Sequence, residues 1–217
     1  CTLDEYVARM KPAQKEIYFI TGERLEAIEH SPYLEKLKEK NCEVILLTDV
    51  VDEWLTQSLR TFKDKNLVSV TKEGLTLDTD EETKQKEIIK KAQTERFGSL
   101  LEKMKTSLTE TVKDVIISDR LTETPVCLVS GENDMSANMQ KILSKMGENY
   151  KQESKRILEI NPNHLIFEAM LKADDTQVKN WAEILYNQAL LSEGSAIANP
   201  VRYSKLIADL IIQSNKQ

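Results

Sequence analysis

The sequence has few of the residues on which most catalytic and metal sites depend. Its 217 residues include two histidines, His30 and His164, and neither has a second histidine or a cysteine at metal-ligand spacing. The three cysteines, Cys1, Cys42 and Cys127, form no close pair. This spacing fits neither a disulfide framework nor a zinc site, and it favours a reducing compartment. We therefore expect no metal site and no catalytic cysteine.

Glycine is also scarce. All six glycines are isolated, so the chain has no glycine-rich loop of the kind that cradles phosphate groups. Gly22 directly follows the strand-like run 16–21, a position where α/β folds can hold a ligand. A single glycine there is more often a plain turn. One hypothesis left open is a small α/β nucleotide-binding enzyme that uses this turn.

Long hydrophobic runs and an excess of positive charge are both missing. No apolar run approaches the roughly 20 residues needed to cross a bilayer. Residues 1–5 are polar and acidic, unlike the basic start of a secretory signal. The formal net charge of −6 argues against general binding to nucleic acid, whose phosphates require a basic surface. We expect neither membrane nor nucleic-acid partners.

The first 75 residues alternate between strand and helix patterns. Strands are predicted at 16–21, 43–48 and 66–70, and the continuous apolar run 43–48 is typical of a strand covered on both faces. Helical segments follow the first two strands. The second helix is expected to carry Trp54, Leu55, Leu59 and Phe62 on an amphipathic face. This order predicts a small, largely parallel α/β layer.

A charged segment then divides the chain. Between residues 72 and 96, 13 of 25 residues are charged and none is aromatic. We predict a small α/β domain at 1–75, a charged linker at 76–85 and a second domain at 86–217. The second domain is predicted to be α+β and to end in a helical hairpin. Its strands are expected at 111–121, 125–131 and 155–161, and its helices at about 86–108, 134–146, 161–173, 175–194 and 199–215.

The helix at 134–146 has an unusual number of methionines. Met135, Met139, Ile142, Leu143 and Met146 share one helical stripe. Core packing is the ordinary explanation for such a stripe. The alternative is an adaptable binding surface, because the unbranched thioether fits varied partners.

The last two predicted helices carry more apolar surface than a hairpin can cover alone. Either this surface folds back onto the preceding sheet, or it packs against a second copy as a four-helix bundle. Pattern alone does not choose between them. Acidic pairs such as Asp49 with Asp52 and Asp174 with Asp175 lie where helices begin, and capping explains them without catalysis.

Several stretches, taken together, resemble one family. They are YVARMKPAQKEIYFITGE (6–23), SPYLE (31–35), EVILLTDVVDEW (43–54) and RLTETPVCLVSGENDMSANMQKIL (120–143). In this order they resemble the heat-shock protein 90 chaperones, and most closely the bacterial HtpG branch. A few residues, such as Ala13 and Arg24, differ from those usual in the family, and they leave the match intact.

The resemblance implies that the chain is a fragment: the end of the chaperone middle domain followed by the C-terminal dimerisation domain. The ATPase domain would be absent, so the fragment itself would be no enzyme and would hold neither ATP nor Mg²⁺. The full-length family member uses both. The resemblance further implies a cytoplasmic, stress-responsive homodimer. Its partners would be partly folded client proteins and other chaperones, but not the co-chaperones that read an acidic EEVD tail.

The resemblance also implies two sets of site residues. The client surface would contain Glu53, Trp54 and Gln57 on one helix and Met135, Met139, Ile142 and Leu143 on another, with these last four exposed and Met146 turned inward. The dimer interface, in a four-helix bundle, would contain Trp181, Leu185, Ala189, Leu206, Ile207, Leu210 and Ile211. The alternative within this fold is a dimerisation scaffold that binds no client.

Overall fold

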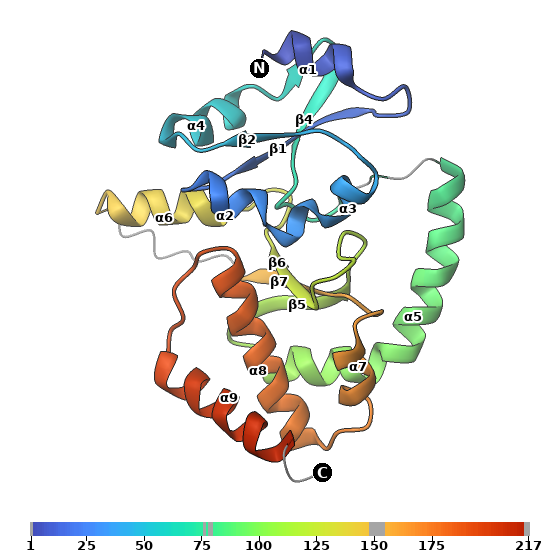
Figure 1. The fold of residues 1–217 in the computed structure, drawn as a ribbon, viewed down its shortest axis with the longest axis vertical. Helices are drawn as coiled ribbons and strands as arrows, with labels where there is room; N and C mark the ends of the chain where they lie inside the picture. Colours follow the sequence, from blue (N-terminus) through green and yellow to red (C-terminus); the bar gives the residue numbers. More distant parts are fainter. Residues whose placement is uncertain (1, 76, 78–79, 148–154, 215–217) are drawn as a thin grey trace.

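The computed structural model describes residues 2–75, 77, 80–147 and 155–214. Two β-sheets follow one another along the chain, and Figure 1 shows the first above the second. The N-terminus lies beside the first sheet, whereas the chain ends below the second sheet. The helices of residues 3–58 surround the first sheet, and most later helices cover the lower face of the second sheet.

The first sheet confirms the predicted parallel layer. Its strand order is β2–β1–β4–β3, in which β1 pairs in parallel with both β2 and β4. The strands are β1 (Glu16–Thr21), β2 (Val44–Leu47), β3 (Thr61–Phe62) and β4 (Lys65–Ser69). The helices are α1 (Leu3–Arg9), α2 (Leu25–Glu29), η1 (Pro32–Leu34), α3 (Glu35–Glu39) and α4 (Val50–Ser58).

Two local predictions for this sheet were wrong. Strand β2 lies at the sheet edge and is half-buried along its length, so it is not covered on both faces. Helix α4 ends at Ser58, and Phe62 belongs to the short strand β3. The cause is the turn at Lys63 and Asp64, whose φ angles of 45° and 60° form a tight connection between antiparallel strands β3 and β4.

The second sheet has the order β5–β7–β6. Strand β7 lies between the other two, parallel to β5 and antiparallel to β6, although it comes last in the sequence. The strands are β5 (Val112–Ile117), β6 (Val126–Val129) and β7 (Arg156–Ile160). The helices are α5 (Asp80–Ser107), α6 (Ala137–Lys145), α7 (Leu165–Met170), α8 (Asp175–Ser192) and α9 (Pro200–Ser214). The predicted α+β organisation is confirmed for this part.

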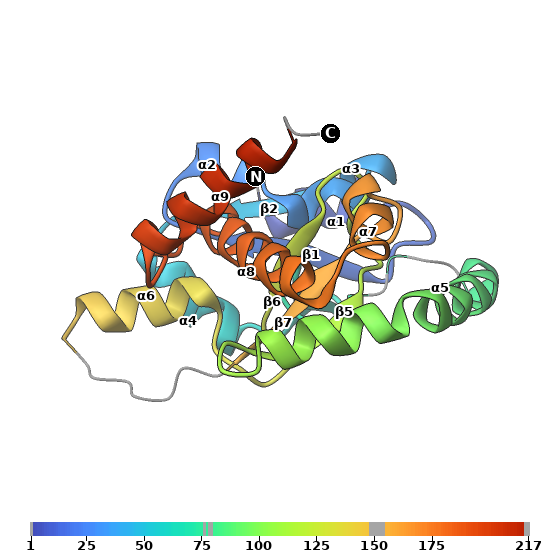
Figure 2. The same ribbon diagram turned by 90° about the horizontal axis from the view of Figure 1, so that it is seen from below.

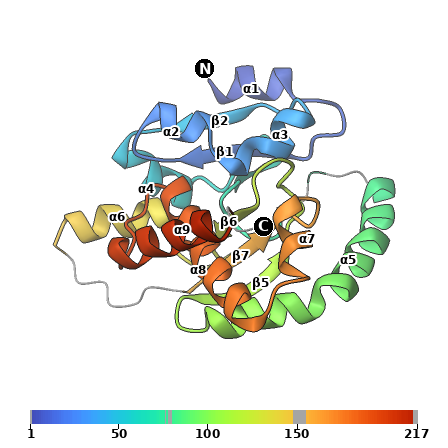
Figure 3. The same cartoon turned by 60° about the horizontal axis from the view of Figure 1, so that its bottom comes forward.

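Helix α5 begins inside the segment predicted to be a linker. Residues 80–85 are helical, whereas residues 76, 78 and 79 of that segment lie outside the described part of the chain. The lower face of the second sheet packs on α5, α7 and α8 around Phe97, Leu158, Phe167 and Leu185. Figures 2 and 3, which bring the bottom of the molecule toward the viewer, show α8 in front of this sheet with α9 beside it.

A second apolar cluster joins the two sheets. Tyr33, Leu37 and Val70 from the first unit pack with Cys127 and Ile157 from the second. These side chains are buried, so the surface between the sheets is itself a core. The two units therefore meet through a continuous apolar layer.

Polar contacts at the same junction are also buried. The Arg120 guanidinium pairs with the Glu159 carboxylate, with 2.9 Å between Arg120 Nε and Glu159 Oε2. It also donates to the carbonyl oxygens of Val70 and Lys72, which follow β4 in the first unit. Nearby, the Glu35 carboxylate accepts the backbone N–H groups of residues 122–124. Together these bonds connect the predicted domains through specific, directional contacts.

Candidate functional site

Helix α6, the methionine-bearing helix, packs beside α4 (Figure 2). It begins at the N-cap Ser136, whose hydroxyl accepts the N–H of Met139, and it ends just before Gly147, which has φ of +80°. The helix predicted at 134–146 is shorter in the structure: Met139, Ile142 and Leu143 lie on it, whereas Met135 precedes the N-cap and Met146 is the C-cap. The burial of the stripe differs from the prediction.

The predicted exposure of this stripe was wrong in three places. Met139 and Leu143 are only 5% and 8% exposed, and Met146 is 64% exposed instead of turned inward. Met135 and Ile142 are half-buried. The reason is that α6 packs against α4 near its start, whereas Figure 1 shows its C-terminal end extending past α2.

Glu53 was predicted on the client surface, but it is 4% exposed. Its Oε2 accepts a hydrogen bond from Ser136 Oγ at 3.0 Å, and its Oε1 accepts one from Asn138 Nδ2 at 2.9 Å. The carboxylate therefore joins α4 to the first turn of α6. Sequence reasoning missed this role because both partners lie more than 80 residues away along the chain.

The loop before α6 is held by the first unit as well. Lys72 Nζ donates to the carbonyl oxygens of Gly131 and Asp134, and the Glu73 carboxylate accepts the N–H of Glu132 at 3.1 Å. Burial lowers the pKa of Lys72. Although α6 belongs to the second unit in sequence, these contacts attach its first turn to the first unit.

Helix α4 presents an apolar surface that the sequence prediction covered only in part. Trp54 is 38% exposed, and Gln57 is exposed beside it. Val50, Val51 and Leu55 are at least half exposed. Val50 lies four residues before Trp54, and Val51 lies four residues before Leu55, so the four side chains form two adjacent i, i+4 pairs. The signal was present in VVDEWL, where Asp49 marks the helix start and four apolar residues follow within six positions.

The predicted dimer residues divide into two groups. Leu185 and Ala189 lie in the chain's own core, and at 0% and 2% exposure they are not on the surface of this chain. Leu206 is also buried, and Trp181 packs against that core. Ile207 and Leu210 are half-buried, whereas Ile211 is exposed. Further exposed apolar residues at this end are Leu191, Val201 and Ile212.

The histidines have local structural contacts. His164 is the N-cap of α7, where its Nδ1 accepts the N–H of Ile166, and His30 Nδ1 lies 3.0 Å from the Glu26 carbonyl oxygen. Within the described residues, no group of three or more histidine, cysteine, aspartate or glutamate side chains could hold a metal ion. In the same part of the chain, no helix is both long and apolar enough to span a membrane.

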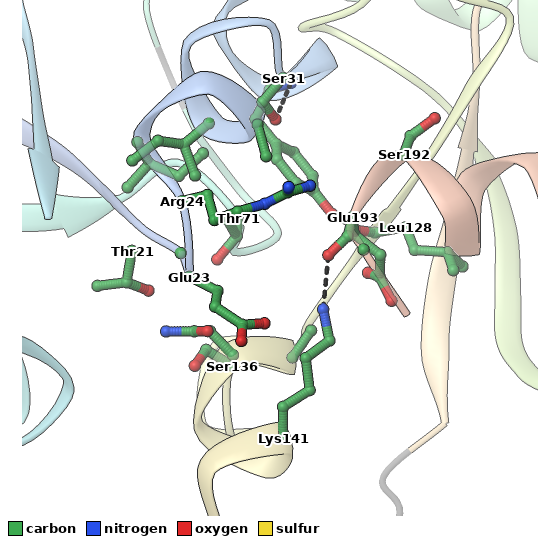
Figure 4. Close-up of a pocket in the computed structure, with 18 of the residues that line it drawn as sticks. Thr21, Glu23, Arg24, Ser31, Thr71, Leu128, Ser136, Lys141, Ser192 and Glu193 are labelled. Carbon is green, nitrogen blue, oxygen red and sulfur yellow. Dashed lines mark hydrogen bonds between the residues drawn. The ribbon is translucent and has the colours of Figure 1, made fainter. Parts of the chain in front are cut away.

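Gly22 has a packing role. A Cβ at this position would lie 2.3 Å from Ile28 Cγ2, so only glycine permits α2 to approach β1 this closely. Next to this turn is a cavity of about 170 Å³, which we name the β1–α6 cavity. Its walls come from the turn after β1, the first turns of α6 and the end of α8 (Figure 4).

Comparison with known proteins agrees with the sequence motifs. The family model described as Hsp90 protein matches residues 1–216. The chain belongs to the Hsp90 family. This Hsp90-family chain is 56% identical over 214 residues to the chaperone protein HtpG of Bdellovibrio bacteriovorus, 43% identical over 220 residues to that of Geobacter sulfurreducens, and 42% identical over 219 residues to that of Myxococcus xanthus.

These alignments cover 98% or 99% of the Hsp90-family chain, but only 34%, 34% and 33% of the three relatives. The chain therefore spans about a third of their length. It accounts for one portion of a longer chaperone architecture.

Proposed function

We propose that this chain is the part of an HtpG-type chaperone that homodimerises and holds partly folded client proteins. The observation that carries the proposal is the exposed apolar face of α4, formed by Val50, Val51, Trp54 and Leu55. Apolar contact without strict shape requirements suits a protein that binds unrelated unfolded chains. The names of the relatives support the chaperone assignment.

Helix α6 supports this surface and contributes less of it than the sequence suggested. Met139 and Leu143 are buried, so they anchor the helix, while Met135, Ile142 and the exposed Met146 remain available for contact. The Glu53 carboxylate sets the position of α6 relative to α4. In this proposal a client contacts α4 directly, and α6 borders the same surface.

Client holding is tested by removing the exposed apolar groups of α4. Trp54→Ala combined with Leu55→Ser should weaken suppression of aggregation of a reduced, unfolded model protein several-fold and leave the thermal unfolding midpoint nearly unchanged. Ile88→Ser is the matched control, because Ile88 is 73% exposed on the distant helix α5. Equal suppression of aggregation by the unchanged chain, the double variant and Ile88→Ser would favour the alternative of a dimerisation scaffold that binds no client.

Homodimerisation is proposed through the outer face of the α8–α9 hairpin. Val201, Ile211 and Ile212 are exposed on α9, and Leu191 is exposed at the end of α8. Isologous packing of two such hairpins would bury this apolar surface in a four-helix bundle. Leu185 and Ala189 would lie beneath the interface as part of each protomer's core.

ATP and Mg²⁺ binding are proposed to belong to parts of the full-length chaperone outside this chain. We further propose a cytoplasmic location and contacts with other chaperones. The competing hypothesis of an α/β nucleotide-binding enzyme predicts that ATP raises the thermal unfolding midpoint of this chain. We expect no such rise.

A further inference from the structure

Strand β2 is an open edge of the first sheet. In the described part of the chain it is the terminal strand and pairs with β1 alone. All four of its residues, 44–47, are apolar and half-buried, whereas β1 beside it is buried at five of six positions. Side chains alternate between the two faces of a strand, so apolar groups are partly exposed on both faces of this edge. Another apolar strand beside β2 would cover them.

The backbone of β2 presents regularly spaced hydrogen-bonding groups on its outer side. The Gly22 N–H donates to the Leu47 carbonyl oxygen at 3.0 Å, so Leu47 points its backbone groups toward β1. In a parallel pair, alternate residues of a strand bond the same neighbour, and the residues between them point their N–H and C=O groups the other way. In the register of β1 with β2, Val44 and Leu46 are these outward residues. Each offers one donor and one acceptor to a further strand.

The other sheet edges have features that oppose pairing with another chain. Strand β3, at the opposite edge of the first sheet, has two residues and leads into the charged turn 63–64. Strand β5 has an irregular register between Val112 and Asp114. On β6 the carbonyl oxygen of Leu128 already accepts the Tyr33 hydroxyl. Strand β2 has no charged residue, no proline and a regular register, so its edge lacks such protection.

Charged groups lie at the two ends of β2 and not along it. Before the strand, the Glu43 carboxylate pairs with an arginine of α1. After the strand, Asp49 and Asp52 form the capping box of α4. In the turn after β1, the Glu23 carboxylate pairs with Lys145 of α6. The C-terminal end of β2 is therefore acidic and leads directly into the apolar face of α4. An apolar segment with a basic residue at its end is complementary to this edge.

We propose that the open edge of β2 pairs with an extended segment of a partly folded protein, which adds a strand to the first sheet. The segment would be apolar, free of proline and basic at one end. Backbone N–H and C=O groups supply the pairing without requiring a particular sequence, which suits a partner recognised by its extended state. This inference rests on the proposed client binding, and it specifies the conformation in which a client is held.

A pair of peptides separates strand pairing from apolar contact. The peptide KTVIVTK, acetylated and amidated, is compared with the same peptide carrying N-methyl groups on its isoleucine and on the following valine. These two N–H groups point to opposite edges of an extended chain, so either edge loses a donor while the side chains stay the same. The methylated peptide should bind at least ten-fold more weakly, because a hydrogen bond is lost and the methyl group keeps the strands apart.

Backbone amide chemical shifts locate the bound peptide. During titration with KTVIVTK to about 1 mM, a concentration that detects weak binding, the amide signals of Val44 and Leu46 should shift. The signal of Lys113, an exposed residue of the irregular edge strand β5, should stay unchanged. The peptide ETVIVTE, with acidic ends, should bind several-fold more weakly than KTVIVTK because the end of β2 is itself acidic.

Protein variants give the second arm. Leu46→Pro removes one outward donor, and proline is compatible with an edge strand where its nitrogen faces away from the sheet. This variant should bind KTVIVTK at least ten-fold more weakly. Leu46→Ala is the matched control, because it shortens the same side chain and keeps the N–H group, and it should bind more tightly than Leu46→Pro. If Leu46→Pro does not fold, the methylated peptide decides the test with the unchanged chain.

Equal binding of the methylated peptide, or no shift at Val44 and Leu46, would overturn strand pairing. Shifts of these two signals with chain concentration alone would assign the edge to a second copy of the chain and would also overturn the proposal. In either case, loss of aggregation suppression in the variant with Trp54→Ala and Leu55→Ser would still support client holding. Failure of this inference is therefore distinguishable from failure of the proposed function.

Discussion

The carboxylate of Glu53 on α4 accepts a hydrogen bond from the side-chain amide of Asn138 on α6, with 2.9 Å between Asn138 Nδ2 and Glu53 Oε1. The same carboxylate accepts the Ser136 hydroxyl, which also caps α6. One buried acidic side chain thus connects two helices that come from different sheet units. Its substitution should affect the arrangement of α6 as well as stability.

Glu53→Ala is expected to lower the free energy of unfolding by about 1–3 kcal/mol, because Ser136 and Asn138 lose their buried acceptor. Chemical denaturation measures this change. The combination with Asn138→Ala should cost less than the sum of the two single substitutions, since both remove the same bond. Gln57→Ala, an exposed position on the same helix, is the control and should have little effect. If the losses in unfolding free energy of the two single substitutions were strictly additive, the result would contradict the hydrogen bond between Glu53 and Asn138.

Arg120→Met should be the most destabilising substitution at the junction of the two sheets. It leaves the Glu159 carboxylate buried without its partner and removes donors to Val70 and Lys72, so a loss of about 3–5 kcal/mol is expected. Arg9→Met breaks an exposed pair with Glu43 and should barely change the unfolding midpoint. Similar midpoints for the two variants would show that the Arg120 pair contributes little.

Substitution of the exposed end of α9 tests the dimer. Ile211→Asp with Ile212→Asp should convert a dimer into a folded monomer, because two charges would enter the proposed apolar interface. Light scattering gives the mass, and circular dichroism checks folding. Asp209→Asn, also exposed on α9, should leave the mass unchanged. A monomeric parent chain would eliminate the proposed bundle.

Burial raises the pKa of the Cys127 thiol well above 9.0. The unfolded thiol ionises near its ordinary pKa while the folded thiol stays protonated, so the free energy of unfolding should fall as pH rises past 9.0. Cys127→Ala should make this pH dependence less steep. Alkylation followed by peptide mass spectrometry should label the half-buried Cys42 before Cys127, which should react only in denaturant. Rapid labelling of Cys127 in the folded chain would contradict its burial.

Strand bounds and helix starts could be predicted from the sequence where they depend on neighbouring residues. The strand at residues 16–21 has the predicted bounds, and Asp49 and Asp174 begin helices with capping boxes. The parallel β1–β2 pair follows from a strand–helix–strand order. The family motifs were likewise visible, and they carried the expectations about function.

The sequence by itself determined the family, the order of most helices and strands, and which helix faces are apolar, although it did not predict α1 or β3. Only the tertiary structure decided what covers those faces: Met139 and Leu143 are buried while Met146 is exposed, and Glu53 is inside the molecule. It also placed β7 between β5 and β6, and Glu193 against the β1–α6 cavity. The physical reason is that the spacing of apolar residues shows which side of a helix or strand is apolar, whereas burial depends on contacts between residues distant in the chain.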